Sequence, residues 1–228
     1  MKLAKSLKNI ERIIKNNITI ETKEGNQWYT EADIKSEELI VARIKEAFLD
    51  ANIISGETLP NLPQNAMQGK CFVIDPIDET TSYVNGSDPC AISIVYMENG
   101  SVLSGVAYLP FTGEVYSAIK GQGTYYKGRD DFEGKKFICP NNRPLKKAVL
   151  AFWKSKEYKE QEYEELYRFT RFNAKDWYCN LGGVINICEV ARGILHSFTK
   201  TKLGYWDIAA ALLIAREAGA KVGYIVPV

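Results

Sequence analysis

The chain has 228 residues, of which 46% are hydrophobic and 25% charged, as expected for one folded domain or two closely joined halves. Lysine plus arginine number 29 and aspartate plus glutamate 28, a net charge of +1, so bulk charge favours neither a nucleic-acid polymer nor a membrane surface as partner. A single histidine, His196, and five cysteines without a C-x-x-C spacing argue against a multi-histidine zinc site and a disulfide framework. Chemistry is therefore expected to rest on carboxylates, hydroxyls and a metal ion.

The first part of the chain is expected to hold two helices and a mainly antiparallel sheet. Apolar residues at helical spacing predict a helix over 3–16, and Thr30 is expected to cap a second helix that reaches about Ala51. A short strand at 53–54 and a fully apolar strand at 71–74 follow. Four β-rich runs separated by turn residues then predict an antiparallel meander, at 90–97, 101–109, 113–119 and 123–127.

The pattern changes near residues 139–144, so we expect an N-terminal half over 1–138 and a C-terminal half over 139–228. Helices and strands alternate in the second half, which is typical of a mixed α/β layer. The expected elements are strand 148–152, helices 156–170 and 183–192, strand 194–199, helix 207–218 and strand 220–226. His196 falls in one of these strands, where a structural role is expected.

The segment over 75–83 places two carboxylates close together. The apolar strand ends at Asp75, Pro76 favours a sharp turn, and Asp78 follows directly. Two neighbouring carboxylates repel unless a cation neutralises them, and hard cations such as Mg²⁺ prefer oxygen ligands. If a short helix starts at Thr80, its free N–H groups could bind a phosphate. The alternative is that Asp75 and Asp78 only cap a turn.

Four blocks resemble those of a known family, the lithium-sensitive and magnesium-dependent inositol monophosphatase-like phosphatases. This family includes bisphosphate nucleotidases and fructose-1,6-bisphosphatase-like members. The blocks are Y-T-E-A-D at 29–33, S-G-E-T at 55–58, D-P-I-D-E-T-T-S-Y at 75–83, and Y-W-D-I-A-A at 205–210 with E-A-G at 217–219. The resemblance implies an α+β fold, a layered αβαβα sandwich, and hydrolysis of a small phosphorylated metabolite by metal-activated water.

The resemblance also implies roles for single residues. The ligands of two or three Mg²⁺ ions would be Glu57, Asp75, the carbonyl of Ile77, Asp78 and Asp207. Asp33 and Thr80 would orient the attacking water, although Asp33 and Asp207 also suit plain helix starts. Substrate would meet the backbone N–H groups of Glu79 and Thr80, with Thr81 and Lys200 as further contacts.

Two departures from the family pattern keep a second class of function open. Glu79 stands in place of a glycine, and could bind metal, turn to solvent or cripple the site; Thr58 replaces a second acid. A binding or regulatory member without catalysis is therefore the alternative. Members also continue for a few strands and turns beyond the last block, so we expect an incomplete C-terminal edge at Val228.

The substrate and the partners are indicated less directly by the sequence. Lys200, with Lys202 close by, occupies the region where inositol phosphatases tend to carry an acid, and two lysines suit a second phosphate. A 3′(2′),5′-bisphosphate nucleotidase or a sugar-bisphosphatase is thus an alternative within the family. Residues 1–15 lack the continuous apolar core of a signal peptide, and no apolar run approaches the length of a membrane span. We expect a cytoplasmic homodimer acting on a small phosphorylated metabolite, with neither nucleic acid nor membrane as partner.

Overall fold

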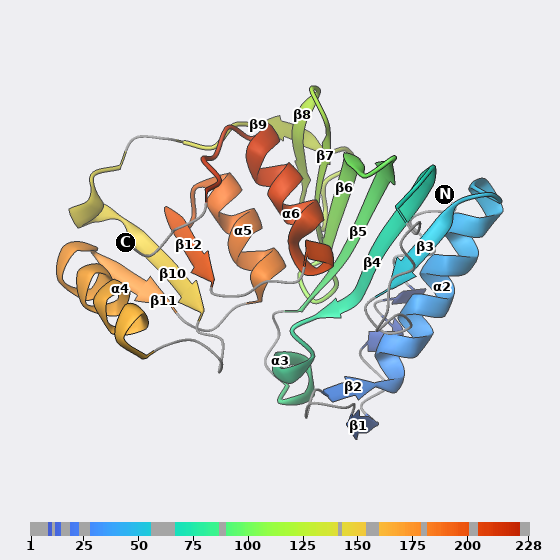
Figure 1. Ribbon diagram of the computed structural model, residues 1–228, viewed down its shortest axis with the longest axis horizontal. Coiled ribbons are helices and arrows are strands. Elements are labelled where there is room, and N and C mark those ends of the chain that lie inside the picture. Colours follow the sequence, from blue (N-terminus) through green and yellow to red (C-terminus); the bar gives the residue numbers. More distant parts are fainter. Residues whose placement is uncertain are drawn as a thin grey trace.

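Five layers of helices and sheets build the molecule (Figure 1). A computed structural model describes residues 9–10, 12–14, 19–22, 28–55, 67–86, 90–140, 143–153, 160–178, 182–200 and 205–223. Helix α2 (Glu31–Ala47) covers one face of a seven-stranded sheet, and helices α5 (Gly183–Arg192) and α6 (Tyr205–Glu217) cover the other. A three-stranded sheet and helix α4 (Glu160–Asn173) complete the stack. This confirms the layered αβαβα sandwich.

The seven-stranded sheet contains the predicted meander. Its order is β3 (Asn52–Ser55), β4 (Lys70–Asp78), β5 (Ala91–Glu98), β6 (Ser101–Leu109), β7 (Glu114–Ile119), β8 (Gly123–Lys127) and β9 (Lys135–Phe137). Strand β3 runs parallel to β4, and all other neighbours are antiparallel. Strand β9 was not predicted, because three residues carry too little periodicity to indicate a strand.

The three-stranded sheet is parallel, in the order β11 (Asp176–Tyr178), β10 (Val149–Trp153) and β12 (Ser197–Lys200). His196 lies just before β12, and its Nδ1 accepts a hydrogen bond of 3.0 Å from the backbone N–H of Val149. The strand expected at 220–226 is wrong over 220–223, which form no regular element. Residues 224–228 lie outside the described ranges, as do 3–8, 11, 15 and 16 of the first expected helix.

The N-terminal strands and helix α2 sit together at one end of the molecule. Strand β1 (Ile20–Thr22) pairs antiparallel with β2 (Trp28–Thr30), and α2 begins directly after β2. The helix ends at Ala47, earlier than the predicted Ala51, because Phe48 leaves helical geometry with φ −135°. Among the described residues, no helix is both long and apolar enough to cross a membrane.

Strand β4 is apolar on both faces because both faces are covered. Phe72 and Ile74 pack in a cluster with Ile40 of α2. Cys71 and Val73, which point the opposite way, pack in a second cluster with Ala210 of α6. A strand buried on both sides reads as a continuous apolar run rather than as an alternation.

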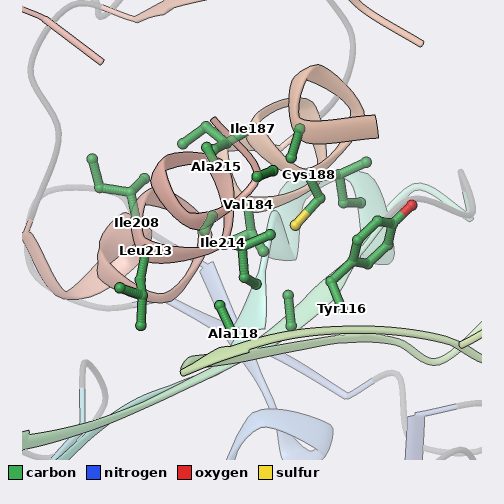
Figure 2. Close-up of a cluster of buried hydrophobic side chains, with 14 of the residues drawn as sticks. Tyr116, Ala118, Val184, Ile187, Cys188, Ile208, Leu213, Ile214 and Ala215 are labelled. Atoms are coloured by element: carbon green, nitrogen blue, oxygen red, sulfur yellow. The ribbon is translucent and has the colours of Figure 1, made fainter. Parts of the chain in front are cut away.

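Helices α5 and α6 share a core with the large sheet (Figure 2). Val184 and Cys188 of α5 and Ile214 of α6 are fully buried in this core, beside Tyr116 and Ala118 of β7. A further anchor is Glu217 of the E-A-G block, whose two carboxylate oxygens accept the N–H groups of Gly121 and Gly123 at 2.9 and 3.0 Å. The block thus attaches the end of α6 to the turn between β7 and β8.

A partly buried ion pair links α5 to the same sheet. Arg192 donates to Glu114 at 3.1 Å and to the Tyr116 hydroxyl at 3.0 Å, and its guanidinium lies 3.8 Å from the ring centroid of Tyr126. Burial raises the pKa of Glu114, but hydrogen bonds from Tyr126 and Thr112 and the charge of Arg192 lower it more, so the net pKa is lowered.

This lowered pKa predicts acid-dependent stability. The contribution of Glu114 is complete above its unfolded pKa of 4.5 and is lost as pH falls through the lower folded pKa. We expect Glu114→Gln to lower the free energy of unfolding at pH 7, and the difference from wild type to shrink as the pH falls from about 5 to 3. Urea unfolding across this range measures it. The exposed Glu133→Gln is the control, and a difference that stays constant with pH would contradict the assignment.

Candidate active site

A β-bulge in β4 turns two aspartates toward the same side of the sheet. Asp75 pairs with Ser93 and Asp78 with Ala91, so three steps along β4 oppose two along β5. In a regular strand, residues three apart point to opposite faces, and one extra residue brings them to the same face. Pro76 falls inside the bulge, where its missing N–H costs no ladder bond. The sharp turn expected at Pro76 is therefore wrong: the strand continues to Asp78.

Hydrogen bonds hold this bulged segment in shape. The Ile77 N–H donates to Oδ1 of Asp75 at 3.2 Å, and the Thr80 hydroxyl donates to the Ile77 carbonyl at 3.3 Å. Helix α3 (Thr80–Val84) then begins directly, as expected, beside β2 (Figure 1). The first N–H groups of a helix have no partner within it, so this turn offers donors close to Asp75 and Asp78.

A hydrogen bond holds Asp78 against the start of α5. Asp78 is 7% exposed, and its Oδ2 accepts a hydrogen bond of 3.0 Å from the backbone N–H of Val184. Gly182 caps this helix, and a methyl group placed on it would lie 2.6 Å from Oδ2 of Asp78 and 2.7 Å from Cγ of Glu79. A glycine is thus required at 182 for β4 and α5 to meet at this point.

Glu79 adopts a backbone conformation that favours glycine. Its φ of 71° and ψ of 50° are left-handed, a region costly for residues with a Cβ. The side chain does not turn to solvent: it is half-buried, and Oε2 is buried without a hydrogen-bond partner among the described residues. Burial raises the pKa of the carboxyl, and the nearby charge of Lys200 lowers it in part.

Glu79→Gly is expected to raise the free energy of unfolding by about 1 kcal/mol, because it removes left-handed strain and a partnerless buried oxygen. Urea unfolding with a chelator present measures this without metal linkage. Asn99→Gly is the matched control: Asn99 also has a positive φ, of 48°, but its side chain accepts the Gly69 N–H at 3.0 Å. It should gain nothing, and an equal gain in both variants would contradict the argument.

Asp33 is buried at the start of α2, on the side of α3. It accepts hydrogen bonds from the backbone N–H of Thr30 at 2.7 Å and from the Thr30 hydroxyl at 2.6 Å, so the predicted cap at Thr30 is confirmed. The charge of Asp33 also acts on a side chain of α3. The pKa of Tyr83 is raised to about 12, by burial first and then by Asp33 and Cys90. Asp33 therefore lies near α3, and its pairing with Thr80 stays a prediction.

The structure describes only some of the remaining predicted site residues. Lys200 ends β12, Thr81 is exposed on α3, and Asp207 lies in the first turn of α6, where only its backbone is described. Glu57 lies outside the described ranges. The described residues bring no three His, Cys, Asp or Glu side chains together as a metal-binding group. The donors that are described, Asp75, Asp78 and the Ile77 carbonyl, present oxygens that suit a hard divalent cation.

The model of the family described as "Inositol monophosphatase family" matches residues 1–225. The chain belongs to the inositol monophosphatase family. A protein of Thermotoga maritima called fructose-1,6-bisphosphatase/inositol-1-monophosphatase is 30% identical over 194 residues, 85% of this chain and 70% of the relative. Nus factor SuhB of Vibrio cholerae is 29% identical over 223 residues, 96% of this chain and 78% of its own length.

A solved inositol monophosphatase structure from Thermotoga maritima has the same fold. Its TM-score is 0.79 at 25% identity, with 96% of this chain and 83% of the other covered. Membership in the inositol monophosphatase family indicates a phosphatase, a hydrolase of phosphate esters. The predicted family is therefore confirmed.

Two features of this inositol monophosphatase family member were not predicted as part of the site. One is Gly182, and the other is the Val184 N–H that fixes Asp78. The glycine pair at 182–183 was visible in the sequence, directly before an apolar helix. Two adjacent glycines at a helix start could have indicated a close approach of another segment, but nothing in the sequence identifies that segment as β4.

Proposed function

We propose that the chain is a Mg²⁺-dependent phosphomonoesterase acting on a small phosphorylated metabolite of the inositol monophosphate type. The observation that carries this proposal is the bulge that turns Asp75 and Asp78 toward one side of β4, directly before the start of α3. Carboxylates beside free helical N–H groups can serve a cation and a phosphate at once. Family membership supports the same reaction class.

One set of residues would bind the metal ion. Asp75, Asp78, Asp207, Glu57 and the Ile77 carbonyl would hold Mg²⁺, in keeping with their oxygen donors. Mg²⁺, when bound, supplies Lewis acidity that lowers the pKa of water and offsets phosphoryl charge.

Further groups would position the reactants. Asp33 and the Thr80 hydroxyl would orient the attacking water for in-line displacement. The N–H groups of Glu79 and Thr80 would donate to the phosphate oxygens. The Val184 N–H keeps Asp78 aimed at the site, since it fixes one carboxylate oxygen.

A second candidate is a binding or regulatory protein without catalysis. Two observations favour it: Glu79 occupies a left-handed, glycine-favouring position beside the proposed phosphate site, and several relatives are called Nus factors. The Glu79→Gly variant separates the two functions. Activity in the wild type supports the phosphatase, whereas activity that arises only in the variant identifies a catalytically impaired member.

The direct test is phosphate release with Mg²⁺ from inositol 1-phosphate, adenosine 3′,5′-bisphosphate and fructose 1,6-bisphosphate. Asp78→Asn should lower both turnover and the calorimetric affinity for Mg²⁺, because it removes a ligand charge from a buried position. The exposed Asp130→Asn is the matched control. Absence of turnover on all three esters, together with absence of Mg²⁺ binding, would overturn the phosphatase proposal.

The partners follow from the same reasoning. A homodimer is implied by the family resemblance, and a net charge of +1 argues against a nucleic-acid polymer or membrane surface as partner. Sedimentation equilibrium of the full chain measures the oligomeric state, and a monomer at micromolar concentration would contradict the dimer.

A further inference from the structure

The small sheet carries a cavity on the face that is turned away from α5. Ser197 and Thr199 of β12 line this cavity, whereas Phe198 between them packs against the core that holds α5 and α6. Successive side chains of a strand point to opposite faces of a sheet, so the sheet separates the cavity from α5. Helix α4 lies on the cavity side (Figure 1). The cavity is therefore distinct from the candidate active site, where the start of α5 meets Asp78.

Helix α4 covers only part of this face. Its Tyr167 packs edge-on against Phe152 of β10 and Trp177 of β11, with ring centroids 6.0 and 5.2 Å apart. Beside it, over β10 and β12, the described residues line a cavity of about 360 Å³. Cavities that bind small molecules measure about 300–1,000 Å³ and combine an apolar lining with a few polar groups. The cavity therefore has the size of a small-molecule site.

The lining of the cavity is apolar and aromatic, with two hydroxyls beside it. Leu150 and Phe152 are contributed by β10, and the half-exposed ring of Phe169 by α4. Leu150 pairs with Ser197 and Phe152 with Thr199, so the hydroxyls lie on the same face as the apolar side chains. Parallel sheets are usually apolar on both faces. Hydroxyls on β12 fit a face that meets a partly polar ligand better than one sealed by apolar packing.

Two further donors in the lining precede the strands of the small sheet: Arg143 comes before β10, and His196 directly before β12. Nδ1 of His196 accepts the Val149 N–H at 3.0 Å. The Val149 carbonyl, 3.2 Å from Nδ1, already accepts the backbone N–H of His196 at 2.8 Å. An accepting Nδ1 leaves the proton of a neutral imidazole on Nε2. Because the described lining contains no aspartate or glutamate, one positive charge and an N–H donor are left for an anion.

We propose that this cavity is a second ligand site, which binds a small organic acid with one carboxylate and an aromatic body. The guanidinium of Arg143 matches a carboxylate with two parallel N–H groups, and Nε2–H of His196 adds a donor. A single carboxylate balances the one positive charge, whereas a phosphate dianion would exceed it. The aromatic body would lie on Leu150 and Phe152 beside the Phe169 ring, where its apolar surface leaves water.

Calorimetric titration with indole-3-acetate tests the site, with a chelator present so that metal binding does not contribute. We expect saturable binding, and much weaker binding of indole-3-acetamide, which has the same shape without the charge. Arg143→Met should lower the affinity for the acid by about tenfold, the usual effect of losing a hydrogen bond to a charged group. Lys146→Met is the matched control, because it removes the same charge from an exposed neighbour outside the lining.

A second variant tests the imidazole, and amide chemical shifts locate the ligand. His196→Asn keeps an acceptor for the Val149 N–H but has no donor at the position of Nε2, so it should weaken binding of the acid severalfold. Addition of indole-3-acetate to the wild type should shift the amide signals of Ser197 and Thr199. Shifts confined to α3 and the start of α5 would instead place the acid at the candidate active site and contradict the inference.

Three further results would overturn the inference. Equal affinity for the acid and the amide would exclude recognition of the carboxylate. Inorganic phosphate that binds as tightly as indole-3-acetate, with the same loss in Arg143→Met, would identify a phosphate site instead. Absence of saturable binding of both indole-3-acetate and phenylacetate at millimolar concentration would show that the cavity does not bind aromatic acids. All these titrations are made without metal and ester, so their outcome is independent of the proposed phosphatase activity.

Discussion

Gly182→Ala is expected to lower phosphate release by about 100-fold, because reacting groups misplaced by as little as an ångström can cost that much. The added methyl group would lie 2.6 Å from Oδ2 of Asp78 and 2.7 Å from Cγ of Glu79. Asp78 cannot withdraw freely, since it is buried and fixed by the Val184 N–H. The carboxylate must therefore lose that hydrogen bond, or α5 must move away from β4.

Turnover of inositol 1-phosphate and the calorimetric affinity for Mg²⁺ should both fall in this variant. The backbone itself is no obstacle, because Gly182 has a φ of −60° that alanine adopts easily. Gly134→Ala is the matched control: its methyl group would meet the Cβ of Tyr125 at an ordinary 3.5 Å. A Gly182→Ala protein with wild-type turnover would show that Asp78 is not a working part of the site.

Local patterns were sufficient for much of this architecture. The meander was predicted because its strands are five to nine residues long and are joined by turn residues. The start of α2 was predicted from Thr30, whose cap needs only Asp33 three residues later. Helix α5 was predicted with its observed bounds, since its apolar face and flanking glycines are encoded within a dozen residues.

Features that depend on distant partners could not be read from the sequence. The bulge between Asp75 and Asp78 is defined only by the pairing with β5. The hydrogen bond that fixes Asp78 comes from Val184, 106 positions further along the chain. The burial of the Glu79 side chain could not be predicted either. A charged residue next to a turn usually faces solvent, but the start of α5 covers this one. Its burial follows from packing between layers, which no local pattern describes.

Gly105→Ala is expected to destabilise the fold by about 3 kcal/mol, the upper part of the range for overpacked cores. The new methyl group on β6 would lie 2.9 Å from Cα of Ala210 and 3.2 Å from the Ala210 carbonyl oxygen. Both are backbone atoms of α6, so no side-chain rotation relieves the contact. The direction of the stability change is informative, because replacing a glycine within a strand by alanine otherwise raises the free energy of unfolding.

Urea unfolding of Gly105→Ala and of the double variant with Ala210→Gly separates backbone from side-chain contact. The second change removes the Cβ of Ala210, also 3.2 Å away, but leaves the Cα and the carbonyl in place. It also adds a helix glycine, which costs about 1 kcal/mol, so we expect no rescue. Full rescue would mean that side chains alone set the distance between α6 and the sheet. Without it, glycine at 105 is what lets α6, whose first turn contains Asp207, pack closely on the large sheet, in which β4 carries Asp75 and Asp78.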